Sequence, residues 1–564
     1  MLENFDPNAI QDLESARQAI AHLLNLIEDL TADLRAAQVE NQRLRDENNR
    51  LKGEQGKPEI KPSKKPAPSS SADHPSTALR MYSSERERHK PQAWKKRSKV
   101  DQIHIDREQV MRMDPAVLPP DAEFKGQSPV IVQDLLLRTD NVRFWKETYY
   151  SPAQGKTYLA ELLKGYVGEF RPGVKSTVLV WYYGMNTSEP KIREFLEHVG
   201  IRISAGQLSN LLIQKQDAFH QDKAALYEAG LRSSPYQQID DTATRVDGVN
   251  QHCHVVCNPL YTCYFTLEKK DRLAVLDVLR NAAPRVYRLN ASAYAWLEPF
   301  GLPGSLVTQL HTLPQEQDLN ETEFVSRLDE LQLPLGSQHR KHILEAAAVA
   351  AYQQQTAWPV VDTLVCDDAG QFKGLTEHLS LCWVHDGRHY KKLEPAVALH
   401  RAQLDTFLGR YWAFYDQLLA YATQPSGERA AQLRLEFDTL FSTVTGYAAL
   451  DERIAKTQAK KAELLPVLEH PELPLHNNLS ELGARLRVRK RDMSYGPRTA
   501  AGKKAWDTFM TLGATAKKLG VSFYQYIYDR VSGTSQMPSL ADRITQQAAQ
   551  RQLGTSWQPQ AASR

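Results

Sequence analysis

The chain has 564 residues, which at roughly 100–200 residues per domain predicts three or four domains. Hydrophobic residues form 41% of it and the net charge is +3, a composition that excludes fibrous and wholly disordered proteins and gives no global sign of a nucleic-acid partner. Five cysteines are too few for a disulfide framework, and there is neither a secretory signal nor an apolar run of about 18 residues, so we expect a cytoplasmic protein without a membrane partner.

Residues 10–52 repeat apolar side chains every seven positions, with no proline to interrupt a helix. The two seam positions hold Leu13, Ile20, Ile27, Leu34, Asn41 and Asn48, and Ala16, Leu23, Leu30, Ala37, Leu44 and Leu51. Such a stripe is buried only when a partner helix covers it, and asparagine at the first seam position favours two parallel strands. We therefore predict a parallel dimeric coiled coil over residues 1–52. The alternative is an amphipathic helix docked on its own protein.

Residues 53–99 are rich in proline, serine and lysine and lack apolar periodicity, which predicts a disordered linker. Twelve basic and four acidic residues lie between positions 57 and 99. Basic flexible segments attract phosphate through counterion release, so Lys95, Lys96 and Arg97 are candidate DNA contacts. A solvating tether is the alternative.

Globular sequence begins near residue 100. We expect residues 100–165 to form a small N-terminal domain with strands at 130–137 and 141–150. Residues 166–230 are predicted to be helical. Within them, helices over 188–199 and 205–219 are joined by a short glycine-containing turn, and Ser204 suits the N-cap of the second helix. This is the layout of a helix-turn-helix DNA-binding region, although many helical hairpins share it.

Acidic residues are placed unusually in the next part of the chain. Three consecutive strands are predicted between residues 236 and 270, and Asp240 and Asp241 lie within the first of them, where burying charge is costly. A helix over 271–281 follows, and a later strand ends at Asp367 and Asp368. An RNase H-like α/β fold has this order of elements: three antiparallel strands, a helix, and a strand with an acid at its tip. In that fold, acids from adjacent strand ends converge.

A third acid, Glu481, lies on a helix predicted to begin near Asn477. It is followed by the basic residues Arg485, Arg487, Arg489, Lys490 and Arg491. A helix that offers one carboxylate and a row of cations suits a metal ion held beside phosphate. The alternative for Glu481 is an intrahelical ion pair with Arg485, one turn further on.

Three motifs together resemble the insertion-sequence-66 type of bacterial DDE transposases. They are Asp240-Asp241-Thr242, Asp367 followed by Cys382-Trp383-Val384-His385, and Asn477-Asn478-Leu479-Ser480-Glu481 followed by Arg489-Lys490. The resemblance runs from about residue 130 to 530. His476 stands where members usually have aspartate, and the cysteine-rich zinc motif of many members is absent because residues 53–150 contain no cysteine.

The resemblance implies metal-dependent phosphoryl transfer on double-stranded DNA in the bacterial cytoplasm, at the nucleoid. Asp240, Asp367 and Glu481 would be the catalytic residues and would hold Mg²⁺ or Mn²⁺, two ions in all, with no zinc expected. Asp241 and Asp368 adjoin this set, but alternation in a strand sends neighbouring residues to opposite faces, and motif alignment selects Asp240 and Asp367. The expected DNA contacts, besides the linker, are His385, Arg388, Arg485, Arg489, Lys490 and Arg491. The implied partners are element ends, target DNA, further copies in a homodimer or larger synaptic complex, and small accessory proteins of the element.

The remaining boundaries follow from periodicity and the motif order. The predicted core comprises residues 231–385, with a fifth strand over 379–385, and residues 473–532. An insertion over 284–360 is predicted to hold helices at 321–331 and 337–355, and an all-helical insertion over 386–472 is predicted to hold helices at 396–422, 427–445 and 451–469. Residues 533–564 are predicted to form a flexible polar tail. Cys253, Cys257 and Cys263 lack the paired spacing of a zinc site and are better explained as small buried residues.

Three functions are consistent with these patterns. The first is an active transposase that cleaves element ends and transfers strands. The second is a catalytically silent, repurposed DNA-binding derivative, and the third is another RNase H-like nuclease such as a junction resolvase. The presence of all three acids favours the first, while the N-terminal zipper and the Asn-Asn-x-x-Glu segment argue against the third.

Overall fold

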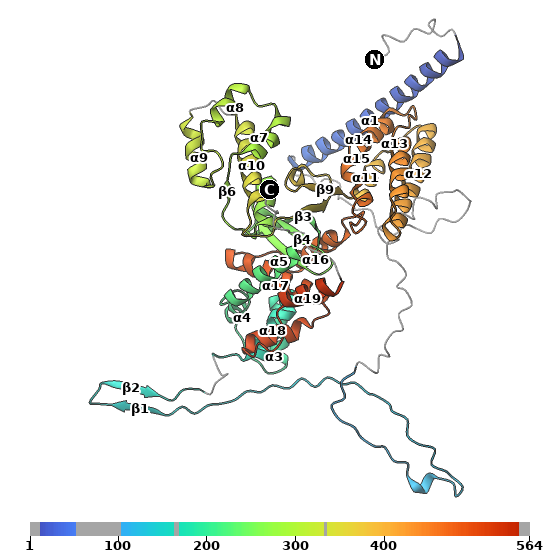
Figure 1. The fold of residues 1–564 in the computed structure, drawn as a ribbon. Helices are drawn as coiled ribbons and strands as arrows, with labels where there is room; N and C mark the ends of the chain where they lie inside the picture. Colours follow the sequence, from blue (N-terminus) through green and yellow to red (C-terminus); the bar gives the residue numbers. More distant parts are fainter. Residues whose placement is uncertain (1–11, 52–102, 163–167, 332–335, 552–564) are drawn as a thin grey trace. The chain divides into compact units, whose positions relative to one another are not determined.

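The computed structural model describes residues 12–51, 103–162, 168–331 and 336–551 (Figure 1). The chain divides into two units. The first comprises residues 1–73, 161–193 and 203–564, and the second comprises residues 74–160 and 194–202. The predicted linker over 53–99, with its candidate DNA contacts Lys95, Lys96 and Arg97, lies outside the described residues.

A five-stranded mixed sheet forms the centre of the first unit, in the order β5-β4-β3-β8-β9. The first three strands along the chain pair antiparallel, and β8 and β9 run parallel to β3. The predicted mixed α/β core is therefore confirmed, including its three consecutive strands. The strands are β3 (Tyr236–Val246), β4 (Val249–Cys257), β5 (Thr262–Leu267), β8 (Thr363–Cys366) and β9 (His378–Leu381).

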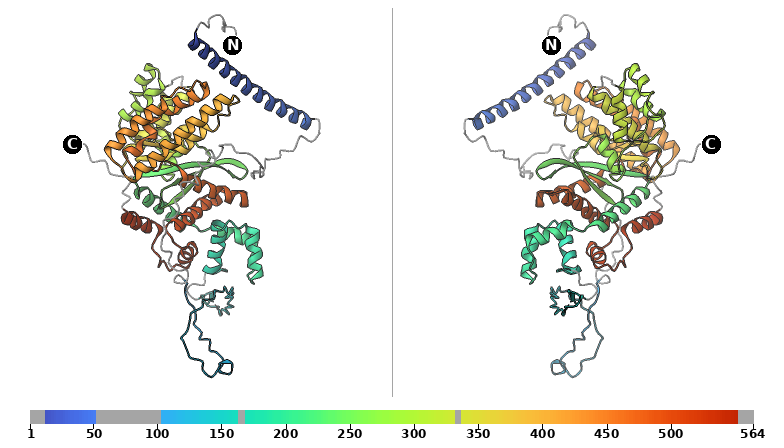
Figure 2. Two further views of the ribbon diagram at one scale, coloured as in Figure 1. Left: turned by 90° about the vertical axis from the view of Figure 1, so that its right-hand side faces the viewer. Right: turned by 90° about the vertical axis from the view of Figure 1, so that its left-hand side faces the viewer.

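Helices lie on both sides of this sheet. In Figure 2 the sheet separates α5, α16 and α17 from the helices of the two insertions. The helices α16 (Asn478–Ser494) and α17 (Ala500–Lys518) pack against the strands. Tyr227 of α5 (Asp217–Arg232) has its ring 5.0 Å from that of Phe265 in β5, and α6 (Arg272–Leu279) packs against α10 (Ser337–Gln354) of the first insertion. All five cysteines are buried, three of them in β4 and β5, as expected for small core residues.

The outer edge of β5 is covered by side chains of α17. The backbone amides of alternate strand residues donate to oxygens spaced four apart on the helix: Thr262 to Thr515, Tyr264 to Thr511 and Thr266 to Asp507, at 3.2, 3.0 and 2.7 Å. Two strand residues advance by about 6.8 Å and four helix residues by about 6 Å, so the two spacings match. These bonds satisfy edge groups that would otherwise be open to pairing with another strand.

Helix α16, which carries Glu481, is fixed close to the sheet. A Cβ atom on Gly483 would lie 2.7 Å from Cγ1 of Val255, so only glycine permits this approach. Further along the helix, the buried Arg487 guanidinium lies 3.2 Å from the Asp507 carboxylate and donates to Thr266 Oγ1 at 2.8 Å. The helix is therefore joined to both β5 and α17.

The helical insertion (residues 386–472) is built around one tryptophan. Trp383 is fully buried, donates from its indole nitrogen to the Leu464 carbonyl at 2.8 Å, and has the rings of Tyr411, Phe414 and Phe437 within 6.2 Å. The helices are α11 (Trp383–Tyr390), α12 (Ala398–Thr423), α13 (Gly427–Phe441), α14 (Ala448–Gln458) and α15 (Lys461–Leu464).

Two boundaries in this region were predicted wrongly. The fifth strand ends at Leu381, and a helix begins at Trp383, because the tryptophan turns into the aromatic core of the insertion. The predicted helix over 451–469 is broken into α14, α15 and a 3₁₀ turn (Pro466–Leu468), consistent with the proline at position 466. The helices predicted at 396–422 and 427–445 are present with shifted ends.

The insertion over 284–360 contains both of its predicted helices, α9 (Glu321–Glu330) and α10 (Ser337–Gln354). Helix α9 begins with a capping box in which Asn320 and Glu323 exchange hydrogen bonds of 3.0 and 3.1 Å. The remaining elements are α7 (Ala291–Leu297), α8 (Gly304–Leu310) and the paired short strands β6 (Val286–Tyr287) and β7 (Leu319–Asn320).

The predicted helix-turn-helix segment contains the expected first helix and turn. Ser204 caps the second helix through a reciprocal pair of hydrogen bonds with Gln207, of 3.1 and 3.2 Å. That helix ends at Ile213, not residue 219, and α5 begins at Asp217. The preceding elements are α2 (Pro172–Leu179), a π-helical turn (Val180–Gly184), α3 (Glu189–His198) and α4 (Ala205–Ile213).

Residues 103–162 do not form the predicted small packed domain. The expected strand at 130–137 is irregular, and its apolar side chains are exposed, including Val130, Val132 and Leu136. Regular strand structure is limited to the hairpin of β1 (Thr148–Ser151) and β2 (Lys156–Leu159). The apolar residues of 130–137 alternate as in a strand, but no other part of the described chain covers them.

The C-terminal segment is more ordered than predicted. The closing helices α17 and α18 (Phe523–Ser532) are followed by α19 (Leu540–Arg551), which lies in the part predicted to be a flexible tail. Leu540 and Ile544 are buried, and α19 packs against α5. Two apolar residues one turn apart were enough to dock an otherwise polar helix.

The predicted N-terminal helix is present as α1 (Leu13–Leu51). Its pairing in a parallel dimer stays a prediction. Across the described helices, α1 included, none combines the length and apolar composition needed to cross a membrane.

We expect Asp507→Ala to lower the free energy of unfolding by about 3–5 kcal/mol, because it leaves the buried Arg487 guanidinium without its carboxylate. Chemical denaturation followed by circular dichroism measures this. The matched control is Asp492→Ala on the same helix as Arg487: the Asp492 side chain is 62% exposed, so its loss should change stability little. Equal effects from the two substitutions would contradict this account.

Candidate active site

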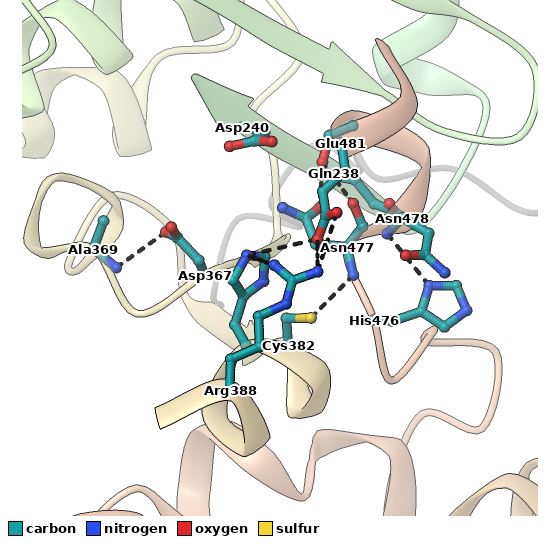
Figure 3. A network of polar contacts seen from close by, with 12 residues as sticks. Gln238, Asp240, Asp367, Ala369, Cys382, Arg388, His476, Asn477, Asn478 and Glu481 are labelled. Carbon is teal, nitrogen blue, oxygen red and sulfur yellow. Dashed lines mark hydrogen bonds and ion pairs between the residues drawn. The ribbon is translucent and has the colours of Figure 1, made fainter. Parts of the chain in front are cut away.

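The register of the sheet places Asp240 and Asp367 on neighbouring strands. Gln238 in β3 is paired with Val365 in β8, and the strands are parallel, so advancing two residues on each brings Asp240 beside Asp367. Asp367 follows directly after the end of β8, and its Oδ1 accepts a hydrogen bond from Ala369 N at 3.1 Å. Figure 3 shows the carboxylates of Asp240 and Asp367 where β8 ends beside β3.

The adjacent acids are engaged elsewhere. Asp241 lies 3.7 Å from Lys270 Nζ and accepts a hydrogen bond from Gln371 at 3.1 Å. Asp368 forms ion pairs with Lys373, at 2.9 Å, and with Lys460. Each of these acids therefore has a cation beside it, which distinguishes it from the neighbouring residue of the predicted site.

Glu481 is positioned by the start of α16. Its backbone amide donates to the carbonyl of Asn477 at 3.2 Å, in the first turn of the helix. The Asn477 side chain is buried and donates to the carbonyl of Ile239, the residue before Asp240, at 2.8 Å. Gln238 Oε1 accepts from Leu479 N at 3.2 Å. Figure 3 shows Glu481 brought by this junction to the region of Asp240 and Asp367.

Helix α11 adds two cationic or polar side chains to the site. Arg388 lies 3.4 Å from Glu481 (Figure 3). Arg388 also donates to His385 Nε2 at 2.9 Å, and His385 lies 3.6 Å from Glu481. Both were predicted to lie just past the fifth strand; β9 ends before them, at Leu381, and they lie on α11. Burial and the Arg388 charge lower the pKa of His385, so the ring is held mainly neutral at neutral pH.

Asp240 is the most perturbed acid of the set. Burial, together with the charges of Asp367, Asp241 and Glu481, raises its pKa to about 7, against the lowering effect of a hydrogen bond from Asp241 N. A carboxyl group of this kind is half-charged at neutral pH in the absence of a counter-ion. Perturbed acids of this type are frequent at functional sites.

The donor set fits a hard divalent cation. Three carboxylates, one within β3, one directly after β8 and one on α16, provide the oxygen ligands that Mg²⁺ and Mn²⁺ prefer. The Nδ1 atom of His385 beside them is buried and has no hydrogen-bond partner in the described structure. The charge of a bound cation would also relieve the repulsion that raises the pKa of Asp240.

The carboxylate oxygens of Asp240, Asp367 and Glu481 do not all lie within 4.8 Å of one another. Within the described ranges, the acidic, histidine and cysteine side chains whose ligand atoms all lie within 4.8 Å of one another are Asp362, Glu377 and His378. That group lies at the opposite ends of β8 and β9 from Asp367, and it was not found by sequence reasoning because nothing in its spacing forms a motif. Carboxylates that hold two ions about 4 Å apart lie further from one another than carboxylates that hold a single ion.

The predicted DNA contacts on α16 differ in exposure. Arg485 and Arg489 are exposed, although Arg485 also lies 3.7 Å from Glu481. Arg491 is half-buried and donates to the Ala243 carbonyl at 2.6 Å. Lys490 was predicted wrongly, because it is fully buried and its ammonium group lies 3.3 Å from the centre of the Tyr182 ring.

Comparisons with known proteins identify relatives of this chain. No protein-family model matches it. It is 33% identical over 306 residues to the uncharacterized protein y4jO of Sinorhizobium fredii, and the match covers 54% of this chain and 94% of y4jO. The chain belongs to the same family as y4jO. Because that name states no activity, the function must be argued from the geometry of the site.

The raised pKa of Asp240 predicts a pH-dependent stability. A carboxyl group whose folded pKa of about 7 lies above its ordinary value of 3.8 weakens the fold as pH rises through this interval. We expect Asp240→Asn to resemble the wild type near pH 4 and to be more stable by about 2–4 kcal/mol at pH 8 in chelator-treated protein.

Denaturation curves at the two pH values, with Asp241→Asn as the neighbouring control, measure the difference. Adding Mg²⁺ at pH 8 should stabilise the wild type more than Asp240→Asn. A wild type and an Asp240→Asn variant with the same pH dependence would show that Asp240 does not carry the unfavourable charge.

Proposed function

We propose that the protein is a DDE transposase, which cleaves the ends of a bacterial insertion sequence and joins them to target DNA in a metal-dependent reaction. The observation that carries this proposal is the convergence of Asp240, Asp367 and Glu481 from β3, the end of β8 and α16. These are the acids of the three motifs that resemble insertion-sequence-66 type transposases.

The topology supports an RNase H-like fold for this core. Three antiparallel strands, β3 to β5, are followed by two strands parallel to β3 that extend the sheet on its other side. In that fold the acids stand at the junction between the two sets of strands. Asp240 and Asp367 occupy this junction here, and the helical insertion lies in the sequence between Asp367 and Glu481.

Asp240, Asp367 and Glu481 would hold two Mg²⁺ or Mn²⁺ ions. When bound, such ions supply activation of a water or a 3′-hydroxyl and stabilisation of the leaving oxygen in an in-line phosphoryl transfer. The chain contributes the orientation of the ligands: Asn477 sets the start of the Glu481 helix against β3, and Arg388 holds the Glu481 side chain.

Cations on two helices, exposed on α16 and half-buried on α11, provide a surface for the DNA backbone. Arg388 is close to the acids, and Arg485 and Arg489 follow Glu481 along α16. Positive side chains bind duplex DNA by displacing counterions from phosphates, so this contribution should weaken with salt. Double-stranded element ends and target DNA are therefore the proposed substrates, acted on by a homodimer or larger assembly in the bacterial cytoplasm, with small accessory proteins as further partners.

The catalytically silent DNA-binding derivative stays a second candidate. Glu481 already has three cationic or polar neighbours, with His385, Arg388 and Arg485 between 3.4 and 3.7 Å away. A cation must compete with this arrangement. End-specific DNA binding without cleavage at any metal concentration would favour this alternative.

We expect Asp240→Asn, Asp367→Asn and Glu481→Gln each to reduce metal-dependent nicking at element ends by at least 10³-fold, because each removes a carboxylate ligand. The assay uses supercoiled plasmid carrying the native flanks of the gene, in Mg²⁺ and in Mn²⁺. Asp241→Asn and Asp368→Asn are the matched controls, since both acids are paired with lysines outside the set.

Undiminished cleavage by any of the three variants would remove that residue from the proposed site. Loss of cleavage in the control variants to the same extent would show that the assay reports folding. Circular dichroism and end binding by every variant separate these outcomes.

A further inference from the structure

Helix α1 contacts the helical insertion through its polar face. Asn25 and Glu28, three residues apart and therefore neighbours on the helix surface, reach the first turns of two insertion helices. Figure 1 shows α1 beside α14. The contact involves α1 and residues 394–448 of the same compact unit.

Glu28 binds the start of α12. Its carboxylate, 12% exposed, accepts hydrogen bonds from the amides of Ala396 and Val397, the latter at 3.0 Å, and lies 3.2 Å from His400 Nδ1. The amides at a helix start have no partner within their own helix, and the helix dipole favours a negative charge there. Glu28 thus supplies the cap that Val397, at the N-cap position, does not provide.

Asn25 binds the start of α14 in the same way. Its Oδ1 accepts from the amide of Ala448, the first residue of α14, at 2.9 Å, and its Nδ2 donates to the Gly446 carbonyl at 2.9 Å. Together with Arg35, which donates to the Glu394 carbonyl at 3.2 Å, these side chains form what we call the α1 clamp.

The apolar seam of α1 points away from the clamp. Asn25 and Glu28 occupy heptad positions opposite or beside the seam, and the seam side chains Ile20, Ile27, Leu30 and Leu34 are between 51 and 58% exposed. The seam also runs past the clamp to Leu44, which is 52% exposed. The contact with the insertion therefore leaves most of the apolar stripe exposed, while the seam residues Ala16 and Leu23 are half-buried.

We propose that α1 is a two-faced dimerisation arm, which holds the helical insertion of its own chain through the α1 clamp and pairs its seam with α1 of a second copy. The occupant is a second copy because Asn41 and Asn48 in the seam satisfy each other only when identical helices run parallel and in register. The clamp then fixes one helical insertion to each strand of the coiled coil. This inference goes beyond the proposed reaction and does not depend on it.

Two variants separate the faces. The clamp variant is Asn25→Ala with Glu28→Gln, and the seam variant is Ile20→Glu with Ile27→Glu. Glu40→Gln is the matched control, because Glu40 is exposed and forms an ion pair with Arg43 of its own helix at 2.7 Å. Light scattering measures mass, and hydrogen exchange measures protection in peptides covering 394–400 and 446–451.

We expect a dimeric wild type with slow exchange in both peptides. The clamp variant should stay dimeric and exchange at least tenfold faster in both peptides. The seam variant should be monomeric with unchanged protection, and Glu40→Gln should match the wild type. Circular dichroism checks that α1 remains helical in each.

Three results would overturn the proposal. Unchanged exchange in the clamp variant would show that the clamp does not form in solution. A seam variant with the mass of the wild type would exclude the seam as the dimer interface. Loss of protection in the seam variant would mean that the clamp is made by the partner's helix and not within one chain. None of these measurements uses DNA cleavage, so they are independent of the proposed reaction.

Discussion

The buried side chain and backbone of Asn477 join the three elements that carry the candidate site. The side chain donates to Ile239 beside Asp240, the backbone amide donates to Cys382 Sγ at 3.3 Å where α11 begins, and the carbonyl accepts from Glu481 one helical turn later. A buried amide that loses such partners costs about 1–3 kcal/mol, so the junction strongly favours one arrangement. Strand β3, the start of α11 and the start of α16 are therefore held in a fixed arrangement, and this fixes the positions of Asp240 and Glu481.

The arrangement of β3, α11 and α16 is kept although the charges of Asp367, Asp241 and Glu481 repel that of Asp240. Burial and neighbouring acids make the charged form of Asp240 unfavourable, which weakens the fold at neutral pH without a counter-ion. The opposing contributions lie away from the acids: the close approach of Gly483 to β4, and the ion pair of Arg487 with Asp507. A site that destabilises its own protein in this way persists only when the surrounding structure is stable enough to hold it, as is common for strained functional groups.

Most of the core could be predicted from sequence because its signals are local. A predicted strand held Asp240 and Asp241, and motif alignment chose Asp240. An apolar run ending in an acid placed Asp367, and a helix pattern with a following basic row placed Glu481. The failures concern residues whose surroundings come from distant parts of the chain. Trp383 leaves the strand pattern because rings from α12 and α13 surround it, and Lys490 is buried because Tyr182, 308 residues earlier, covers it. Neither neighbour is visible in a local window.

The same distinction explains why the heptad repeat allowed two interpretations. An apolar stripe covers less than half of a helix surface, so a helix that pairs through its seam still has polar faces on which to dock. Periodicity identifies the seam, because burial of many similar side chains leaves a repeat in the sequence. It cannot identify Asn25 and Glu28, because capping two helix starts needs only one amide and one carboxylate at the correct separation. Asn477 is hidden for the same reason: its bonds to Ile239 and Cys382 are made by single polar groups, which leave no repeat in the sequence.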